Sequence, residues 1–268
     1  MNQKGMQPGD ELSGDARQQA EKLWLAGRDF DVKIAEQLAI LGVHKGVVNR
    51  RLEANMWITV IISGTEWDNF FGLRCHEMAE PHFQEIARMM RQARDASTPK
   101  ELAQGQWHLP LIFEEDWQNL INQARIVNND PDGDYRQQVT ESIVKISVGR
   151  CARVSYLNHD GVRDYNEDIA LHDKLMRSRP LHAAPAEHVA QAMDWPSWLD
   201  DVELPTNVYE LRQAVIAERK QRIKYNERPS QPQLRAEAAL GQMQSGNYLG
   251  FAQYRKTLAD ENIGGLMA

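Results

Sequence analysis

Residues Trp57–Arg74, WITVIISGTEWDNFFGLR, combine a short β-branched run with an aromatic-rich helical segment. The run 57–62 has the composition of a strand, because β-branched and aromatic side chains fit a pleated surface. Thr65 carries a hydroxyl group of the kind that caps helix starts, so we expect a helix from Trp67 to Arg74. The stretch therefore predicts a chain that mixes strands and helices.

The same stretch sets four aromatic side chains around two polar ones. The aromatic residues are Trp57, Trp67, Phe70 and Phe71. The Asn69 amide and the Arg74 guanidinium have a spacing that suits one helix. Aromatic walls with an amide and a guanidinium suit a planar heterocycle that carries phosphate or carbonyl groups. The alternative is a buried helix stripe with Arg74 as a surface cation, because such stripes are common in cores.

Outward from this stretch, apolar residues recur mainly at helical spacing. We expect helices at 11–41, 44–55, 83–93, 139–153, 168–176 and 208–225. Residues 97–114 and 130–134 are rich in turn formers and are expected to be irregular. The pattern predicts a helix-rich α+β fold. We expect residues 1–10 to be a linker and 11–268 a single domain, with a helical part at 11–128 and a second part at 132–268.

Composition narrows the possible functions. The chain has 268 residues and a net charge of -7, so a nucleic-acid duplex is not the expected partner. No run approaches 18 apolar residues, so we expect no membrane span. The two cysteines, Cys75 and Cys151, form no CxxC pair, which argues against a zinc site and fits a reducing cytoplasm.

Two further segments carry candidate chemistry. Arg153 and Ser155, in CARVSY, could hold a phosphate or could cap a helix end. The segment 182–188, HAAPAEH, sets two imidazoles and a carboxylate at an expected helix start, where Pro185 suits the first turn. Free backbone N–H groups there can meet phosphate oxygens. A metal site is less consistent with the spacing, and a capped surface helix remains the plain alternative.

Together these pieces resemble the flavin-dependent thymidylate synthases. ARVSY at 152–156 and HAAPAEH at 182–188 look like two motifs of that family, and TEWDNFFGLR followed by Ala79-Glu80-Pro81 looks like a third. The order of the motifs is similar to a phage-type branch of the family. The resemblance implies a helix-rich α+β fold with a small antiparallel sheet and a homotetramer. It implies methylation of dUMP to dTMP, with methylenetetrahydrofolate as the carbon source, reduced FAD as the hydride source and NADPH as the reductant of the flavin.

The resemblance also assigns residues by position. Those that fall on FAD-binding positions are Asn69, Ser155, His182 and Glu187. Those that fall on or near dUMP-binding positions are Arg50, Arg74, Gln253 and Arg255. Arg74 is also the expected catalytic residue, because an arginine beside the uracil ring stabilises the negative charge that develops on it.

The chain departs from the family pattern in several places. The family has a different, polar residue at each of three positions occupied here by Ala184, Met78 and Glu80. The R-H-R signature is absent from the sequence. We therefore expect an incomplete subunit. A separate chain that carries the signature, an interrupted gene or a truncated chain would each explain its absence. The alternative is a non-catalytic remnant that binds nucleotide or acts in assembly. A plain helical scaffold would require all three motif matches to be coincidental.

Overall fold

The computed structural model describes residues 9–154, 164–193 and 208–258. The chain forms two compact units. Unit 1 comprises residues up to Thr59 together with Asp68–Thr98, and unit 2 comprises Val60–Trp67 together with the chain from Pro99 onward. The boundaries between the units lie at 59/60, 67/68 and 98/99, whereas the sequence pattern predicted a boundary between two parts at 128–132.

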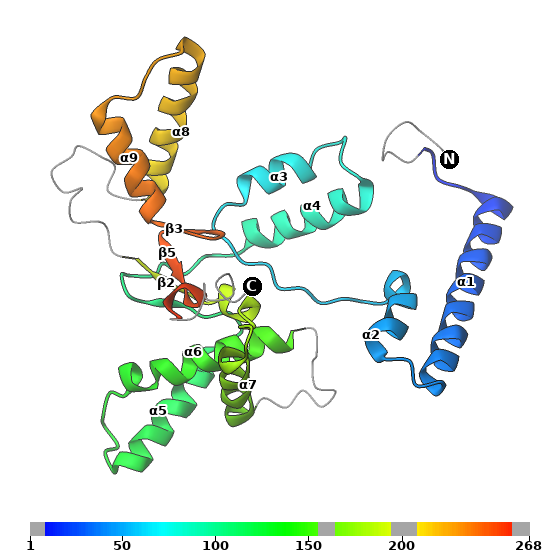
Figure 1. The fold of residues 1–268 in the computed structure, drawn as a ribbon, viewed down its shortest axis with the longest axis horizontal. Helices are drawn as coiled ribbons and strands as arrows, with labels where there is room; N and C mark the ends of the chain where they lie inside the picture. The colour runs from blue at the N-terminus through cyan, green and yellow to red at the C-terminus, as the bar shows by residue number, and fades with distance from the viewer. Residues whose placement is uncertain (1–8, 155–163, 194–207, 259–268) are drawn as a thin grey trace. The chain divides into compact units, whose positions relative to one another are not determined.

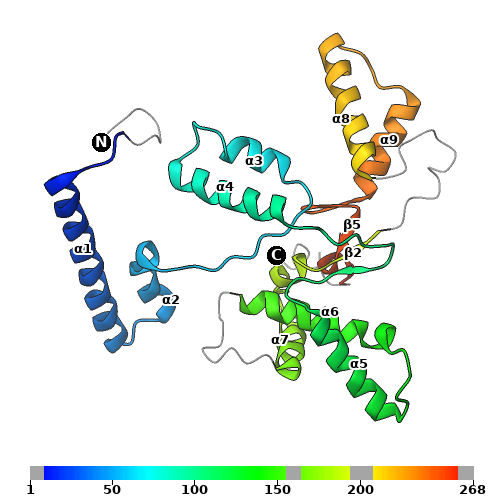
Figure 2. The same cartoon turned by 180° about the vertical axis from the view of Figure 1, so that it is seen from behind.

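The regular secondary structure of the described part of unit 1 is entirely helical (Figures 1 and 2). Its elements are α1 (Gly14–Ile40), α2 (Lys45–Val48), η1 (Asn49–Arg51), η2 (Glu53–Asn55), α3 (Asp68–Arg74) and α4 (Pro81–Ala96). Gly42 adopts a φ of 80° just after α1, and the Val43 N–H returns to the Leu38 carbonyl at 3.0 Å. This is the glycine-terminated helix end that the sequence predicted.

The helices α3 and α4 pack against each other through Phe71. Phe71 is buried, and the Arg94 guanidinium of α4 lies 4.6 Å from the centre of its ring. The start of α4 is capped by Glu80, whose carboxylate accepts a hydrogen bond from the Phe83 N–H at 2.9 Å. Pro81 occupies the first turn, where its missing N–H costs nothing.

Unit 2 combines helices with two small antiparallel sheets. Its helices are α5 (Glu114–Asn128), α6 (Arg136–Arg153), α7 (Tyr165–Arg177), η3 (Ala184–Glu187), α8 (Val208–Tyr225), α9 (Gln231–Gln242) and η5 (Tyr254–Thr257). Its strands are β1 (Trp107–His108), β2 (Ala190–Ala192), β3 (Gln244–Ser245), β4 (Tyr248–Leu249) and β5 (Phe251–Gln253). The first sheet has the order β1-β2-β5, and β3 pairs with β4. This arrangement confirms a helix-rich α+β fold with a small antiparallel sheet.

Helix α6 lies at the centre of unit 2 and is buried over most of its length. Its Ile143 packs with Ile121 of α5, and its Val148 packs with Val189 next to the sheet. At Gly149 the next helix approaches so closely that a Cβ would stand 2.4 Å from the Asp168 carbonyl oxygen of α7. Only glycine permits this contact without a shift of the helices.

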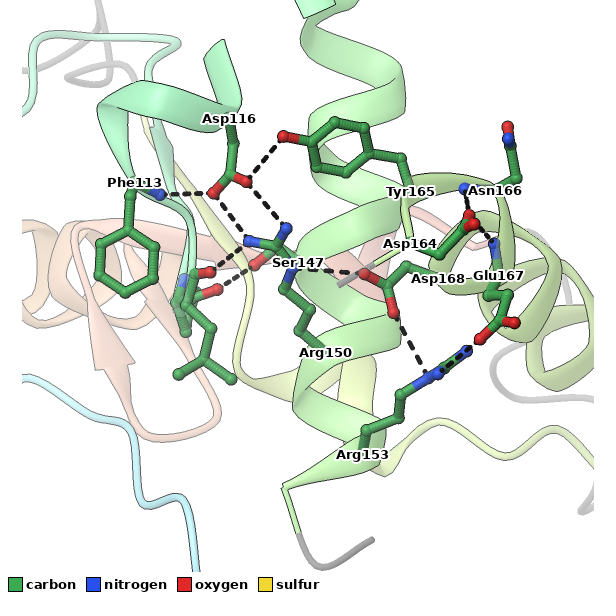
Figure 3. Close-up of polar contacts among 12 residues, drawn as sticks. Phe113, Asp116, Ser147, Arg150, Arg153, Asp164, Tyr165, Asn166, Glu167 and Asp168 are labelled. Carbon is green, nitrogen blue, oxygen red and sulfur yellow. Dashed lines mark hydrogen bonds and ion pairs between the residues drawn. The ribbon is translucent and has the colours of Figure 1, made fainter. Parts of the chain in front are cut away.

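A buried charge network joins α5, α6 and α7 (Figure 3). The Arg150 guanidinium donates to both carboxylate oxygens of Asp116, at 2.7 and 2.8 Å, and to Asp168 at 3.3 Å. It also donates to the Leu111 carbonyl at 2.7 Å, and Tyr165 donates to Asp116 at 3.1 Å. Because every partner is hydrogen-bonded, the network fixes the three helices in one register.

The two carboxylates of this network titrate differently. Burial acts to raise the pKa of Asp116, but hydrogen bonds from Arg150 and the Phe113 N–H outweigh it and lower the net pKa. Burial raises the pKa of Asp168, and the two arginines Arg150 and Arg153 offset only part of that effect. Arg150 keeps a raised pKa because the two carboxylates overcome its own desolvation.

The structure departs from the sequence pattern at three points. Residues 57–62 form no strand, since no neighbouring segment of the described chain pairs with them. Pro185 opens only the one-turn helix η3, because the chain enters β2 directly afterwards. Helix α9 was not expected, although Ser230 and Gln233 form a capping box at its start.

Candidate functional site

Three of the residues assigned by resemblance meet in unit 2. The Arg255 guanidinium forms an ion pair with the Glu187 carboxylate. The Gln253 side chain donates to the Glu187 carbonyl at 3.1 Å. Glu187 lies 66 and 68 residues from these partners along the chain. The structure therefore brings Glu187, Gln253 and Arg255 together as one hydrogen-bonded group, here called the Glu187 cluster.

The sheet register explains why this cluster forms. Strand β2 pairs antiparallel with β5, and Ala190 stands opposite Gln253. Continuing this register by three residues brings Glu187 level with the segment just after Gln253. The Tyr254 N–H extends the pairing by donating to the Val189 carbonyl at 2.7 Å. A short strand pair thus positions a carboxylate and a guanidinium from distant parts of the sequence.

A tight turn holds Gln253 in place. Gly246 has a φ of 58°, and a Cβ there would lie 2.6 Å from the side-chain oxygen of Gln253. The Gln253 backbone N–H donates to the Ser245 hydroxyl at 3.1 Å, and the Gln253 side chain is 5% exposed. Gln253 is therefore a buried positioning residue, whereas Arg255 is one-third exposed and can present positive charge.

His188 and Tyr248 lie beside the Glu187 cluster. The sequence pointed to His188 only as one of the two imidazoles of the 182–188 segment, and it did not point to Tyr248. Tyr248 donates its hydroxyl to the His188 carbonyl at 2.8 Å, and the His188 ring lies 3.1 Å from the Ser63 hydroxyl. Burial lowers the pKa of His188, and it raises the pKa of Tyr248 to about 12. Both groups are therefore neutral at physiological pH. No sequence pattern predicts the contact between His188 and Ser63, because these residues are 125 positions apart.

The other assigned residues from 155 to 184 do not join the Glu187 cluster. His182 is exposed, and its backbone N–H donates to the Ser178 hydroxyl at 3.1 Å. Ala184, which replaces a hydroxyl residue of the family motif, is also exposed. Ser155 lies outside the described residues. The 182–188 segment thus contributes Glu187 to the cluster and leaves the His182 imidazole accessible.

The assigned residues of unit 1 are on its surface. Arg50 lies on η1, and Asn69 and Arg74 lie at the two ends of α3; all three are exposed. The Arg74 guanidinium lies 5.9 Å from the Phe83 ring centre. Of the four aromatic residues expected around it, Phe70 and Phe71 pack edge to face within unit 1, while Trp57 is fully exposed.

A cavity lined by aromatic residues does exist in unit 2, but other residues form it. It has a volume of about 1050 Å³, and its aromatic walls are Trp107, Trp117 and Tyr254. Thr140 and Gln191 supply polar groups to the same lining. Tyr254 lines this cavity, and its sequence neighbours Gln253 and Arg255 bond Glu187.

The described side chains limit the ligands that this protein can hold. Within 9–154, 164–193 and 208–258, no group of three or more His, Cys, Asp or Glu side chains could hold a metal ion. No helix in those same ranges is long and apolar enough to cross a membrane. The Arg255 guanidinium is a donor for anionic groups, and the paired Glu187 carboxylate compensates part of its charge.

Comparisons with known proteins add no family assignment. None of the family models, curated proteins or solved structures compared with the chain gave a significant match.

Proposed function

We propose that this protein is a flavin-dependent thymidylate synthase subunit that methylates dUMP to dTMP. The observation that supports the proposal most is the Glu187 cluster. The 182–188 match supplied Glu187, and a looser resemblance of FAQYRK at 251–256 supplied Gln253 and Arg255. Both of these residues bond Glu187. The pairing of β2 with β5 brings these residues together and leaves Arg255 one-third exposed beside Glu187.

In this proposal each residue has a physical role. Arg255, fixed by Glu187, binds a phosphate group, and buried Gln253 holds the Glu187 backbone in position. Arg74 binds the uracil base and stabilises its ionised form. Asn69 and His182 contact FAD, and Arg50 contacts dUMP. FAD, when bound, supplies the hydride, while methylenetetrahydrofolate supplies the carbon and NADPH reduces the flavin.

The role of Arg74 is open to a direct test. Loss of a charge-assisted hydrogen bond costs about 1.5–3 kcal/mol, so Arg74→Ala should weaken dUMP binding about 10- to 100-fold. Isothermal titration of dUMP in the presence of FAD measures this change. Arg88→Ala is the matched control, because Arg88 is an exposed arginine on α4 of the same unit. Equal binding by both variants would remove Arg74 from the proposal.

A second candidate is a remnant of the family that binds nucleotide without catalysis. It is favoured by Glu80, which stands at a family polar position but is engaged as the cap of α4, bonded to Phe83 and to His82. Release of tritium from ring-labelled dUMP separates the two candidates. Tight dUMP binding without release, in the presence of FAD, the folate and a polypeptide that carries the R-H-R signature, would support the remnant.

A further inference from the structure

The N-terminal helix α1 carries an uncovered apolar stripe. The helix has 27 residues, and every residue from 14 to 30 is exposed. Leu23 and Phe30 are 75% and 60% exposed. At about 100° per residue, six positions share one stripe about 80° wide. They are Ala16, Ala20, Leu23, Gly27, Phe30 and Ile34, of which the first five are exposed and Ile34 is half-buried.

The spacing of this stripe is that of a paired helix. The six positions are separated alternately by four and three residues, which is the a/d pattern of a two-helix seam. Toward its C-terminal end the helix already has a partner, because Ala35 is buried and Asp31 pairs with Arg51 of η1. An isolated helix of this exposed length is only marginally stable in water, so its first half needs a partner as well.

The side-chain sizes identify that partner. We propose that α1 pairs antiparallel with the α1 helix of a second copy of this chain, centred on Leu25. In this register Ala20 meets the partner's Phe30, Gly27 meets the partner's Leu23, and Ala16 meets the partner's Ile34. Each large side chain then faces a small one. A Cβ on Gly27 would meet nothing within 4 Å, so the space for the partner's leucine is open.

The flanking charges agree with the same register. Arg17 comes beside the partner's Asp31, and the two Trp24 rings meet at the two-fold axis. Asp31 also bonds Arg51 of its own chain, and a carboxylate can accept from two guanidinium groups. A parallel pairing would instead set Phe30 against Phe30 and Gly27 against Gly27. That arrangement alternates crowding with voids, and both destabilise a packed interface.

A single helix pair is smaller than a standard protein interface, so the association should depend on concentration. Sedimentation equilibrium of the full chain over a hundredfold range of concentration measures it. Phe30→Glu should reduce the mass of the assembly by half. Val32→Glu, the same change on the opposite face of α1, should leave the mass unchanged. Helix content by circular dichroism checks that both variants fold.

Cysteine pairing tests the orientation. In a Cys75→Ser background, Leu23→Cys and Gly27→Cys chains of different length should form a mixed disulfide when combined, and neither should cross-link alone. Disulfide formation by Leu23→Cys alone would overturn the antiparallel register. A wild-type chain that stays monomeric at the highest concentration, or a Phe30→Glu variant of unchanged mass, would overturn the pairing itself.

Discussion

At the residue scale, Arg150 is a buried cation that links α5, α6 and α7 of unit 2. Its side chain is 7% exposed and bonds two buried carboxylates and a carbonyl. Removing one partner of a buried ion pair leaves an uncompensated charge, which costs about 3–5 kcal/mol. Arg150→Ala should therefore lower the free energy of unfolding by about that amount, as measured by urea denaturation.

The control for this prediction is an exposed ion pair of the same type. Arg177 pairs with Asp173 one helical turn away, and its side chain is 81% exposed. Arg177→Ala should leave the unfolding free energy nearly unchanged, because exposed pairs contribute little. Similar losses for both variants would show that the Arg150 network does not stabilise the helices beyond an ordinary surface contact.

Three partly or fully buried histidines give unit 2 a pH dependence. Burial lowers the pKa of His108, His172 and His188 from the ordinary value of 6.5, so folding favours their neutral forms. Their contribution to stability is complete above that value and is lost as the pH falls from 6.5 toward the folded pKa values. Each contributes a slope of at most about 1.4 kcal/mol per pH unit within this window.

We therefore expect the unfolding free energy to fall when the pH is lowered from 7 to 5.5. His188→Gln should reduce the size of this fall, since one titrating group is removed. His182→Gln is the control, because His182 is an exposed histidine of the same segment. Denaturant titrations at the two pH values measure the difference. A pH response that His188→Gln leaves unchanged would contradict a role for the His188 proton.

The sequence identified Glu187, Gln253 and Arg255 through motif resemblance, but not their contacts with each other. It did not point to Arg150 and Asp116 at all. These two residues are 34 positions apart, and an arginine on a helix normally reads as solvent-exposed. Only the packing of α5 on α6 shows that the pair is buried.

At the element scale, α6 and α7 approach each other closely at Gly149. Gly149→Ala places a methyl group 2.4 Å from the Asp168 carbonyl oxygen, so the helices must separate. Such overpacking costs about 1–3 kcal/mol, and we expect the midpoint of thermal unfolding to fall accordingly.

Gly241→Ala provides the comparison for this change. Gly241 lies on α9, and a Cβ there meets nothing within 4 Å. Alanine has the higher helix propensity, so the midpoint should stay the same or rise slightly. A Gly149→Ala protein that melts like Gly241→Ala would show that α7 can move away without loss.

Periodicity predicted most helices because their apolar spacing is local information. The strands were harder to predict because each has only two or three residues, and such strands exist only through their partners. Residues 57–62 show the converse. They have strand composition without a strand, because nothing in the described chain offers them an edge to pair with.

At the scale of the whole molecule, the two units carry separate candidate residues. Unit 1 carries Arg50, Asn69 and Arg74 on its surface, and unit 2 carries the Glu187 cluster. The resemblance implied a function for the residues of both units. Among the assigned residues that the structure describes, hydrogen bonds join those of the Glu187 cluster. The helix-rich α+β class follows from composition and periodicity, but the catalytic proposal depends on ligand binding.

The most direct test of that proposal is retention of flavin. The purified chain is mixed with FAD, dUMP and a polypeptide that carries the R-H-R signature, and is then separated by gel filtration. We predict that yellow flavin elutes with the wild-type protein. Arg255→Ala should release the flavin or weaken dUMP binding, while Arg228→Ala, an exposed arginine elsewhere in unit 2, should not. A wild-type protein that elutes colourless under these conditions would contradict the proposed function.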